Sequence, residues 1–210
     1  MSQDFQINDL HLDVLKEIGN IGAAHAATSL SQLLNRKVDM FVPSVKLVTF
    51  DEMFELAGGA EEQIACIFLR IQGDVSGSMF FMLSLDSANH FIQLLTGDKT
   101  FDFHNPPVSE IGVSSMQELG NILSGSYLSA LSDFTKLKIM PTVPSLAVDM
   151  VGAMISYGLV EISQYSDEVI LIDTEICEEG NPASEAINGN FFLLPDPDSY
   201  KTIFRSLGVL

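Results

Sequence analysis

The pattern of apolar and polar positions predicts two long helices, one in each half of the chain. Apolar or small residues recur every three or four positions from near Leu10 to about Asn35, and again from a cap at Ser109 to about Phe134. In the first helix the predicted buried stripe is Leu15, Ile18, Gly22, Ala26, Leu30 and Leu33. In the second it is Met116, Leu119, Leu123, Tyr127, Leu131 and Phe134, each 101 positions after its counterpart. Self-similarity at a fixed offset indicates a duplicated unit.

Shorter segments between the long helices predict the other elements. In the first half we expect a strand over 38–48 that Pro43 interrupts, a short helix over 51–57, strands over 64–71 and 78–85, and a helix over 86–96 that Asp86 caps and Gly97 ends. After the Pro106-Pro107 junction we expect a strand around Pro144, a helix over 149–157, strands over 168–176 and 190–194, and a helix over 197–207.

The duplication extends to the end of each half. The segments 77–86 and 189–198 have equal length and similar sequence, but their offset is 112, so the second half carries an insertion between Gln164 and Asn188. The sequence therefore predicts an α+β fold, with one domain over residues 1–210. Two pseudo-two-fold α-β-α-β-β-α repeats, over about residues 9–100 and 109–208, would share a largely antiparallel sheet, because the junction is short and apolar surface is abundant.

Composition narrows the possible partners and the compartment. The formal net charge of -18 argues against binding to nucleic acid and to anionic membranes, and it fits either a basic protein partner or ordinary solubility. Cys66 and Cys177 are isolated, and the four histidines form no close pair, so we expect no metal site and a cytoplasmic location. Residues 1–9 lack the features of a signal peptide, and Pro141, Pro144 and Asp149 interrupt the most apolar region, so no membrane span is expected.

A second, polar face is also repeated on the two long helices. The first helix carries Asp13, Glu17 and Asn20, the second carries Ser114, Glu118 and Asn121, and each Asn is followed after 22 intervening residues by a proline, Pro43 or Pro144. Residues three apart share one helix face, so each Glu points with its Asn. A single copy would fit an ordinary solvated face. Two copies indicate function, because solvated faces drift after a duplication.

Glycine precedes each Asn in the middle of a helix. Glycine costs roughly 1 kcal/mol relative to alanine at such a position. Gly19 and Gly120 therefore indicate either close packing against a neighbouring element or clearance for the backbone of a partner.

The repeated Glu and Asn fit hydrolysis of a phosphoryl group. A carboxamide donates and accepts hydrogen bonds, so it can orient a water in line with phosphorus, and a carboxylate can accept a proton or bind the partner. The sequence has no Walker-type loop, reactive-cysteine loop or dense metal-ligand cluster. We therefore expect a substrate that brings its own metal and its own phosphate cradle.

The doubled Asp/Ser-x3-Glu-x2-Asn signature with its proline, and the run from Glu17 to Ala24, resemble the CheC family of bacterial chemotaxis phosphatases. The resemblance covers the whole chain. It implies hydrolysis of the aspartyl phosphate of a CheY-type receiver without a covalent intermediate. The catalytic and supporting residues that it implies are those of the two motifs: Glu17, Asn20, Glu118 and Asn121, supported by Asp13, Ser114, Pro43 and Pro144. The chain would hold no cofactor, since the Mg2+ belongs to the receiver.

The resemblance also implies a second partner and leaves one alternative open. The partner is the receptor deamidase CheD, for which Asp149 is a candidate contact, although a helix cap is an equal interpretation of that residue. CheX-like relatives keep one motif and dimerise, and FliY-like relatives carry an extra C-terminal domain for which this chain has no room. We therefore expect a monomer closest to CheC. The alternative is a non-catalytic adaptor that binds phosphorylated CheY and CheD.

Overall fold

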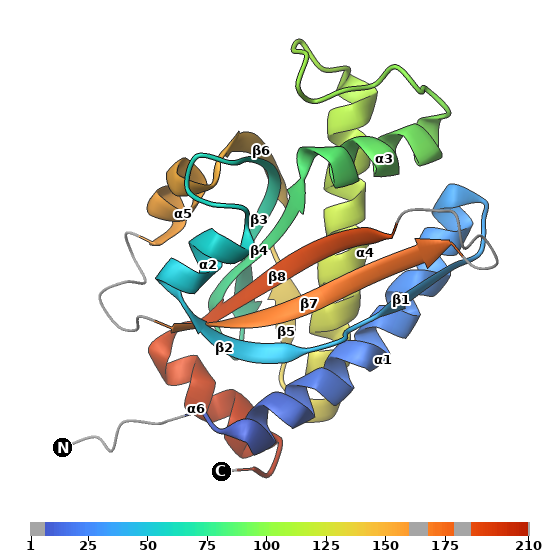
Figure 1. The fold of residues 1–210 in the computed structure, drawn as a ribbon. Coiled ribbons are helices and arrows are strands. Elements are labelled where there is room, and N and C mark those ends of the chain that lie inside the picture. The colour runs from blue at the N-terminus through green and yellow to red at the C-terminus, as the bar shows by residue number, and fades with distance from the viewer. Residues whose placement is uncertain (1–6, 160–167, 179–185, 210) are drawn as a thin grey trace.

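The computed structural model describes residues 7–159, 168–178 and 186–209, and these form six helices and one eight-stranded sheet (Figure 1). The helices are α1 (Asp9–Leu34), α2 (Phe50–Leu56), α3 (Leu85–Thr96), α4 (Glu110–Thr135), α5 (Val151–Leu159) and α6 (Pro197–Ser206). The strands are β1 (Val38–Phe41), β2 (Val45–Thr49), β3 (Gln63–Gly73), β4 (Gly77–Ser84), β5 (Ile139–Pro141), β6 (Ser145–Met150), β7 (Glu168–Glu178) and β8 (Ile187–Pro195).

The order of elements corrects the predicted repeat by one strand. Each half runs helix-strand-strand-helix-strand-strand-helix. The segment predicted as one strand around Pro43 is two strands, β1 and β2, and the segment around Pro144 is likewise β5 and β6. Proline has no N–H to donate to a ladder, so each pair of strands is interrupted there.

The sheet is antiparallel throughout, as predicted, and it interleaves strands of the two halves. Its order is β1-β7-β8-β4-β3-β5, with β2 also paired to β7 and β6 also paired to β3. The first two strands of each half therefore pair with the third strand of the other half. This order is unchanged when β1–β4 are exchanged with β5–β8, and neither half could complete the sheet without the other.

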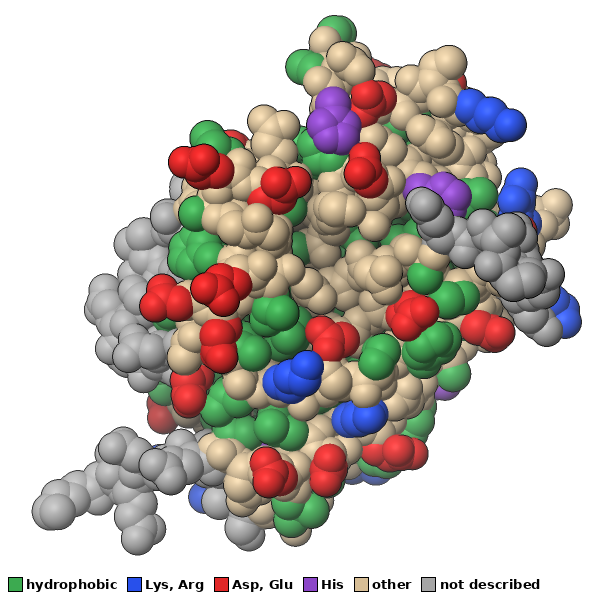
Figure 2. Space-filling model, viewed as in Figure 1, with side chains coloured by type: hydrophobic (Ala, Val, Ile, Leu, Met, Phe, Trp, Pro, Cys, Tyr) green, Lys and Arg blue, Asp and Glu red, His purple; other side chains and the backbone are tan. Residues whose placement is uncertain are grey.

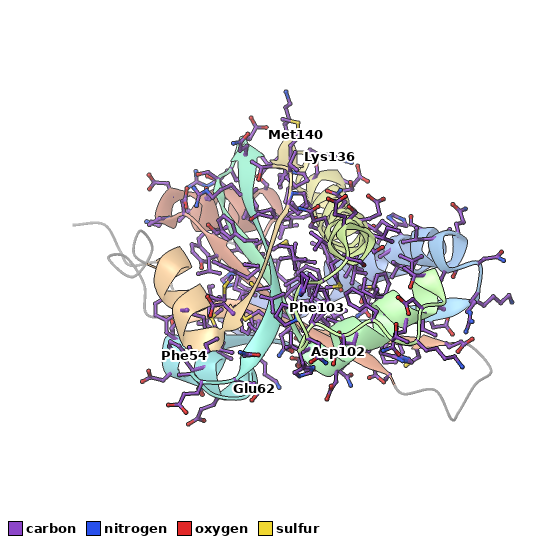
Figure 3. All side chains as sticks on the ribbon, turned by 90° about the horizontal axis from the view of Figure 1, so that it is seen from above. Phe54, Glu62, Asp102, Phe103, Lys136 and Met140 are labelled. Atoms are coloured by element: carbon purple, nitrogen blue, oxygen red, sulfur yellow. The ribbon has the colours of Figure 1, made fainter. Side chains whose placement is uncertain are left out.

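Helices cover both faces of the sheet, and the two long helices lie together on one of them. The larger core contains residues of α1, α3, α4 and α6, and the smaller core, on the other face, contains residues of α2 and α5. In Figure 3, Lys136 and Met140 lie on the opposite side of the molecule from Phe54 and Glu62.

The helices α1 and α4 cross at a glycine. A Cβ atom on Gly22 would lie 3.0 Å from the Cα of Tyr127, so a larger residue would require the backbone of α4 to shift slightly away from α1. The predicted stripes are buried along most of both helices, with Leu33 half-buried. The prediction for Phe134 was wrong. It lies in the last turn of α4, beyond the edge of the core, and its side chain is 49% exposed.

The ends of the helices confirm some predicted caps and correct others. Asn8 caps α1, Ser109 caps α4, and Gly97 ends α3 with a φ of 75°, in the left-handed region that suits glycine. The cap of α3 is Ser84 and not Asp86, which lies in the first turn of the helix. Asp149 lies in strand β6 and does not cap α5, so the helix-cap interpretation of this residue is wrong.

The surface shows the acidic character of the sequence. On the face seen in Figure 2, acidic side chains are spread widely, with scattered Lys and Arg side chains among them. Within the described ranges, no helix has both the length and the apolar character that crossing a bilayer requires.

Candidate functional site

The structure places both sets of motif residues on one polar face of each long helix. Asp13 and Glu17 on α1, and Ser114 and Glu118 on α4, are exposed. The two asparagines differ: Asn20 is half-buried, whereas Asn121 is exposed.

The carboxamide of Asn20 is held by the backbone of the chain itself. Its Oδ1 accepts a hydrogen bond from the Val42 N–H at 3.0 Å, and its Nδ2 donates to Lys16 O at 3.1 Å and to Val42 O at 3.5 Å. Val42 is 2% exposed and packs on Gly19, where a Cβ atom would lie 3.4 Å from Val42 Cγ2. Asn20 therefore fixes the segment between β1 and β2 onto α1, and its amide is occupied.

The carboxamide of Asn121 has a different environment. Its Nδ2 donates to Glu118 Oε2 at 3.4 Å, so the two predicted partners meet at the surface. Val143, which corresponds to Val42 in the repeat, is 89% exposed. The preceding residue Thr142 is tied to β3, because its N–H donates to Arg70 O at 2.8 Å and its hydroxyl accepts from the Arg70 N–H at 3.0 Å. The segment between β5 and β6 thus leaves the amide of Asn121 available to a partner.

The two glycines beside the asparagines differ in how closely the rest of the chain packs on them. Both are buried, and a Cβ atom on Gly120 would lie 2.6 Å from Ile67 Cγ2 on β3. That distance is too short for any side chain without a shift of Ile67 or of α4. A Cβ atom on Gly19 would meet Val42 Cγ2 at 3.4 Å, which is an ordinary contact distance. Of the two interpretations of these glycines, the structure supports close packing for Gly120, whereas packing does not require glycine at position 19.

The supporting prolines lie in the segments that separate the paired strands. Pro43 is exposed between β1 and β2, and Pro144 is buried between β5 and β6. Each follows the valine that distinguishes the two sites. Because the strands are interrupted there, Val42 and Val143 both lie outside the sheet ladder, and one is buried while the other is exposed.

A polar network that sequence reasoning missed ties the segment before α4 to α3. Asp102, on the segment between α3 and α4 (Figure 3), accepts hydrogen bonds from the side chain of Asn89 at 2.8 Å and from the N–H of His104 at 2.9 Å. The bonds from His104, with those from Asn89 and Asn105, lower the pKa of the Asp102 carboxyl to about 2. An Asp that bonds the N–H two residues later is a familiar turn signal, and the Asp102-x-His104 spacing could have revealed it.

The ring of Phe101 packs on the first turn of α4, at Gly112. A Cβ atom on Gly112, in the first turn of α4, would lie 2.1 Å from Phe101 Cε2, so the aromatic ring occupies the place of a side chain. The glycine therefore allows the segment before α4 to pack directly on the helix that carries Glu118 and Asn121.

Other chemistry is not assembled in the described parts of the chain. Their His, Cys, Asp and Glu residues form no group of three or more that could hold a metal ion. Cys66 is fully buried, and burial raises the pKa of its thiol to about 12, so it is protonated at neutral pH and is not a nucleophile.

Comparison with known proteins places the chain in a family. A family model described as the CheC-like family matches residues 10–47 and 114–148, which contain both motifs and both prolines. The Bacillus subtilis protein named CheY-P phosphatase CheC is 46% identical over 202 residues, which cover 96% of each chain. This chain belongs to the CheC-like family.

Two further comparisons concern FliY proteins. The Bacillus subtilis flagellar motor switch phosphatase FliY is 30% identical to this CheC-like chain over 135 residues, which cover 63% of this chain and 34% of FliY. The crystal structure of FliY from Thermotoga maritima has a TM-score of 0.75, covers 97% of this chain and 98% of its own, and is 19% identical. At that identity the likeness shows the fold alone.

Proposed function

We propose that this chain is a phosphatase that hydrolyses the aspartyl phosphate of a CheY-type response regulator in bacterial chemotaxis. The observation that carries the proposal is the exposed pair of Glu118 and Asn121, which meet at 3.4 Å on α4 with the carboxamide unclaimed by the backbone. The 46% identity to a protein named CheY-P phosphatase CheC supports the same substrate.

The residues of the exposed pair have complementary tasks. Asn121 would hold a water with its carbonyl oxygen and contact the phosphoryl group through its N–H, which aligns the water for in-line attack. Glu118, one turn earlier, would hold the Asn121 amide in place and contact the receiver. The water attacks phosphorus directly, so no covalent intermediate forms on this chain. The Mg2+ of the receiver would neutralise the charge on the phosphoryl oxygens.

The first motif has a different task in this proposal. Asn20 is a positioning residue for the Val42 segment, and its carboxamide would have to release the Val42 backbone before it could orient a water. Glu17 is exposed and still able to contact a partner. Most of the activity is therefore assigned to the α4 site.

The test is the decay of a phosphorylated CheY-type receiver in Mg2+ with the wild type and with the Asn20→Ala/Asn121→Ala double variant. Thr28→Ala is a matched control, because Thr28 is exposed on α1 outside the motif. The proposal predicts that the wild type and Thr28→Ala accelerate decay and that the double variant does not. Decay unchanged by the wild type would contradict it.

A second candidate is the adaptor function, with CheD as the partner. Among the described strands, β6 pairs with β3 alone, so its other edge is open, and Val148, Asp149 and Met150 on it are exposed. An exposed strand edge is a site for strand addition by another protein. If Asp149→Lys abolishes binding of a purified CheD-type deamidase and leaves receiver decay unchanged, the two functions use separate surfaces.

A cytoplasmic location is part of the proposal. The proposed substrate, a CheY-type receiver, is an intracellular signalling domain. Both cysteines of the chain are free thiols, which suits a reducing compartment.

A further inference from the structure

Two exposed aliphatic side chains occupy the same position in the two halves. Leu10 is the second residue of α1 and Ile111 is the second residue of α4, and they lie 101 positions apart, the offset of the motif residues. Leu10 is 56% exposed and Ile111 is 67% exposed. Burial within the chain therefore does not explain an aliphatic residue at either position.

On α4 this side chain borders a groove. The groove has a volume of about 420 Å³ and is lined by Ile111, by Leu33 from the last turns of α1 and by Leu95 from the last turns of α3. Ser114 and Glu118 of the motif line the same groove. Figure 1 shows these three helix ends in the same part of the molecule. The apolar groove is thus continuous with the proposed catalytic pair.

The groove lies in register with that pair along α4. Ile111, Ser114, Glu118 and Asn121 are spaced by three, four and three residues, which keeps them on one face of the helix. At 1.5 Å per residue, Ile111 lies about 10 Å from Glu118 and about 15 Å from Asn121 along the helix axis. A partner that places a phosphorylated aspartate at Asn121 must cover Ile111 if it follows the helix.

The charge of the groove specifies the surface that would cover it. Its lining includes the carboxylates of Glu110 and Glu118 and no Lys, Arg or His. An apolar side chain flanked by Lys or Arg is complementary to such a groove, because its basic neighbours meet the carboxylates at the rim while its apolar part displaces water between Ile111, Leu33 and Leu95.

The walls of the groove are held in place before any partner binds. Asn89 on α3 binds Asp102, and it also accepts a hydrogen bond from the Phe103 N–H at 2.8 Å. Phe101 packs on Gly112 next to Ile111. These contacts fix α3, and with it Leu95, against the start of α4, so little ordering is needed on docking.

We infer that Ile111 is the anchor of a docking groove that captures the phosphorylated receiver through an apolar side chain with basic neighbours, about 10–15 Å from the aspartyl phosphate. This inference rests on the proposed function. Ile111 does not touch the reacting atoms, so it contributes to affinity and not to the chemical step. The matching exposure of Leu10 places an exposed aliphatic residue seven positions before the Glu of each motif.

The experiment measures steady-state hydrolysis of a phosphorylated CheY-type receiver in Mg2+ by the wild type, Ile111→Ser and Ile111→Leu. Loss of one buried aliphatic anchor is expected to raise KM about tenfold with kcat within about twofold, and Ile111→Leu should restore the wild-type KM. Leu56→Ser is the matched control, since Leu56 is an exposed aliphatic residue on α2, on the other face of the sheet. A KM for Ile111→Ser equal to that of Leu56→Ser would overturn the inference, and so would a loss confined to kcat.

A binding measurement separates this inference from the proposed function. The receiver is loaded with beryllofluoride and Mg2+, and its dissociation constant is measured with the wild type and Ile111→Ser. A constant about tenfold weaker for Ile111→Ser supports the groove even if the wild type does not accelerate decay, in which case only the phosphatase proposal fails. Equal constants, or no binding by the wild type, would overturn the groove.

Discussion

The two motif helices carry the same pair of residues in different surroundings. On α1 the Asn20 carboxamide bonds the backbone of Val42, whereas on α4 the Asn121 carboxamide bonds only its own motif partner among the described contacts. The difference lies in the segment between two strands, where one valine is buried and its counterpart is 89% exposed. A duplicated motif can therefore give one asparagine a structural task and leave the carboxamide of the other exposed.

The largest expected effect separates the two asparagines by activity. Asn121→Ala should lower the rate of receiver dephosphorylation about a hundredfold, because it removes the group that orients the water in the proposed mechanism. Asn20→Ala should keep most of the activity per folded molecule. The rates are measured at equal concentrations of folded protein, and an equal loss from both substitutions would contradict the assignment.

For stability the order of the two substitutions should be reversed, with Asn20→Ala more harmful than Asn121→Ala. Asn20→Ala leaves the N–H of the buried Val42 without its acceptor, which should lower the free energy of unfolding by about 1–3 kcal/mol. Asn121→Ala removes an exposed side chain and should stay within about 0.5 kcal/mol of the wild type. Urea unfolding measures both values. If Asn121→Ala lowered the free energy of unfolding more than Asn20→Ala, the hydrogen bond between Asn20 and the Val42 N–H would contribute little to stability.

The two glycines sharpen the comparison further. Gly120→Ala should destabilise by about 1–3 kcal/mol, because its methyl group would lie 2.6 Å from Ile67 Cγ2 and force a shift in the core. Gly19→Ala meets Val42 at 3.4 Å, and the better helix propensity of alanine should bring its cost to about 1 kcal/mol or less. Thermal unfolding of the two variants tests this order, and similar melting temperatures would contradict it.

The smallest expected effect concerns the hydrogen bonds of Asp102, in the segment before α4. The pKa of Asp102 is about 2 in the folded protein and its ordinary value is 3.8, so its hydrogen bonds stabilise the fold fully above pH 4 and lose that effect as the pH falls toward 2. Asp102→Asn should therefore lower the melting temperature slightly at pH 7, and the difference from wild type should shrink between pH 4 and pH 3. A difference independent of pH would exclude the ionised carboxylate as its cause.

Much of this architecture could be predicted from the sequence. The period of Leu15, Ile18 and their counterparts fixed both long helices to within two residues, and the offset of 101 pointed to matched halves. The predictions were wrong where tertiary contacts decide. Phe134 continues the apolar period but extends beyond the core. Ser84 caps α3 because the helix begins at Leu85 and the Ser84 hydroxyl accepts a hydrogen bond from the Ser87 N–H.

The inequivalence of the two sites could not be predicted. Val-Pro-Ser occurs at both places, at 42–44 and 143–145, so these three residues give no reason for Val42 to fold onto α1 and Val143 to face solvent. The residue before them differs, Phe41 in one half and Thr142 in the other, but the bonds that Thr142 makes with Arg70 of β3 exist only in the folded sheet. Likewise, the groove at Ile111 forms only when the ends of α1 and α3 meet the start of α4.

The most direct test of the central claim is backbone hydrogen exchange at Val42 and Val143, measured by NMR in the wild type, Asn20→Ala and Asn121→Ala. The account predicts that the Val42 amide exchanges slowly in the wild type and much faster in Asn20→Ala. The amide of the exposed Val143 should exchange fast in all three proteins. If the two amides exchange equally fast in the wild type, Asn20 does not hold the Val42 segment, and the distinction between the two sites fails.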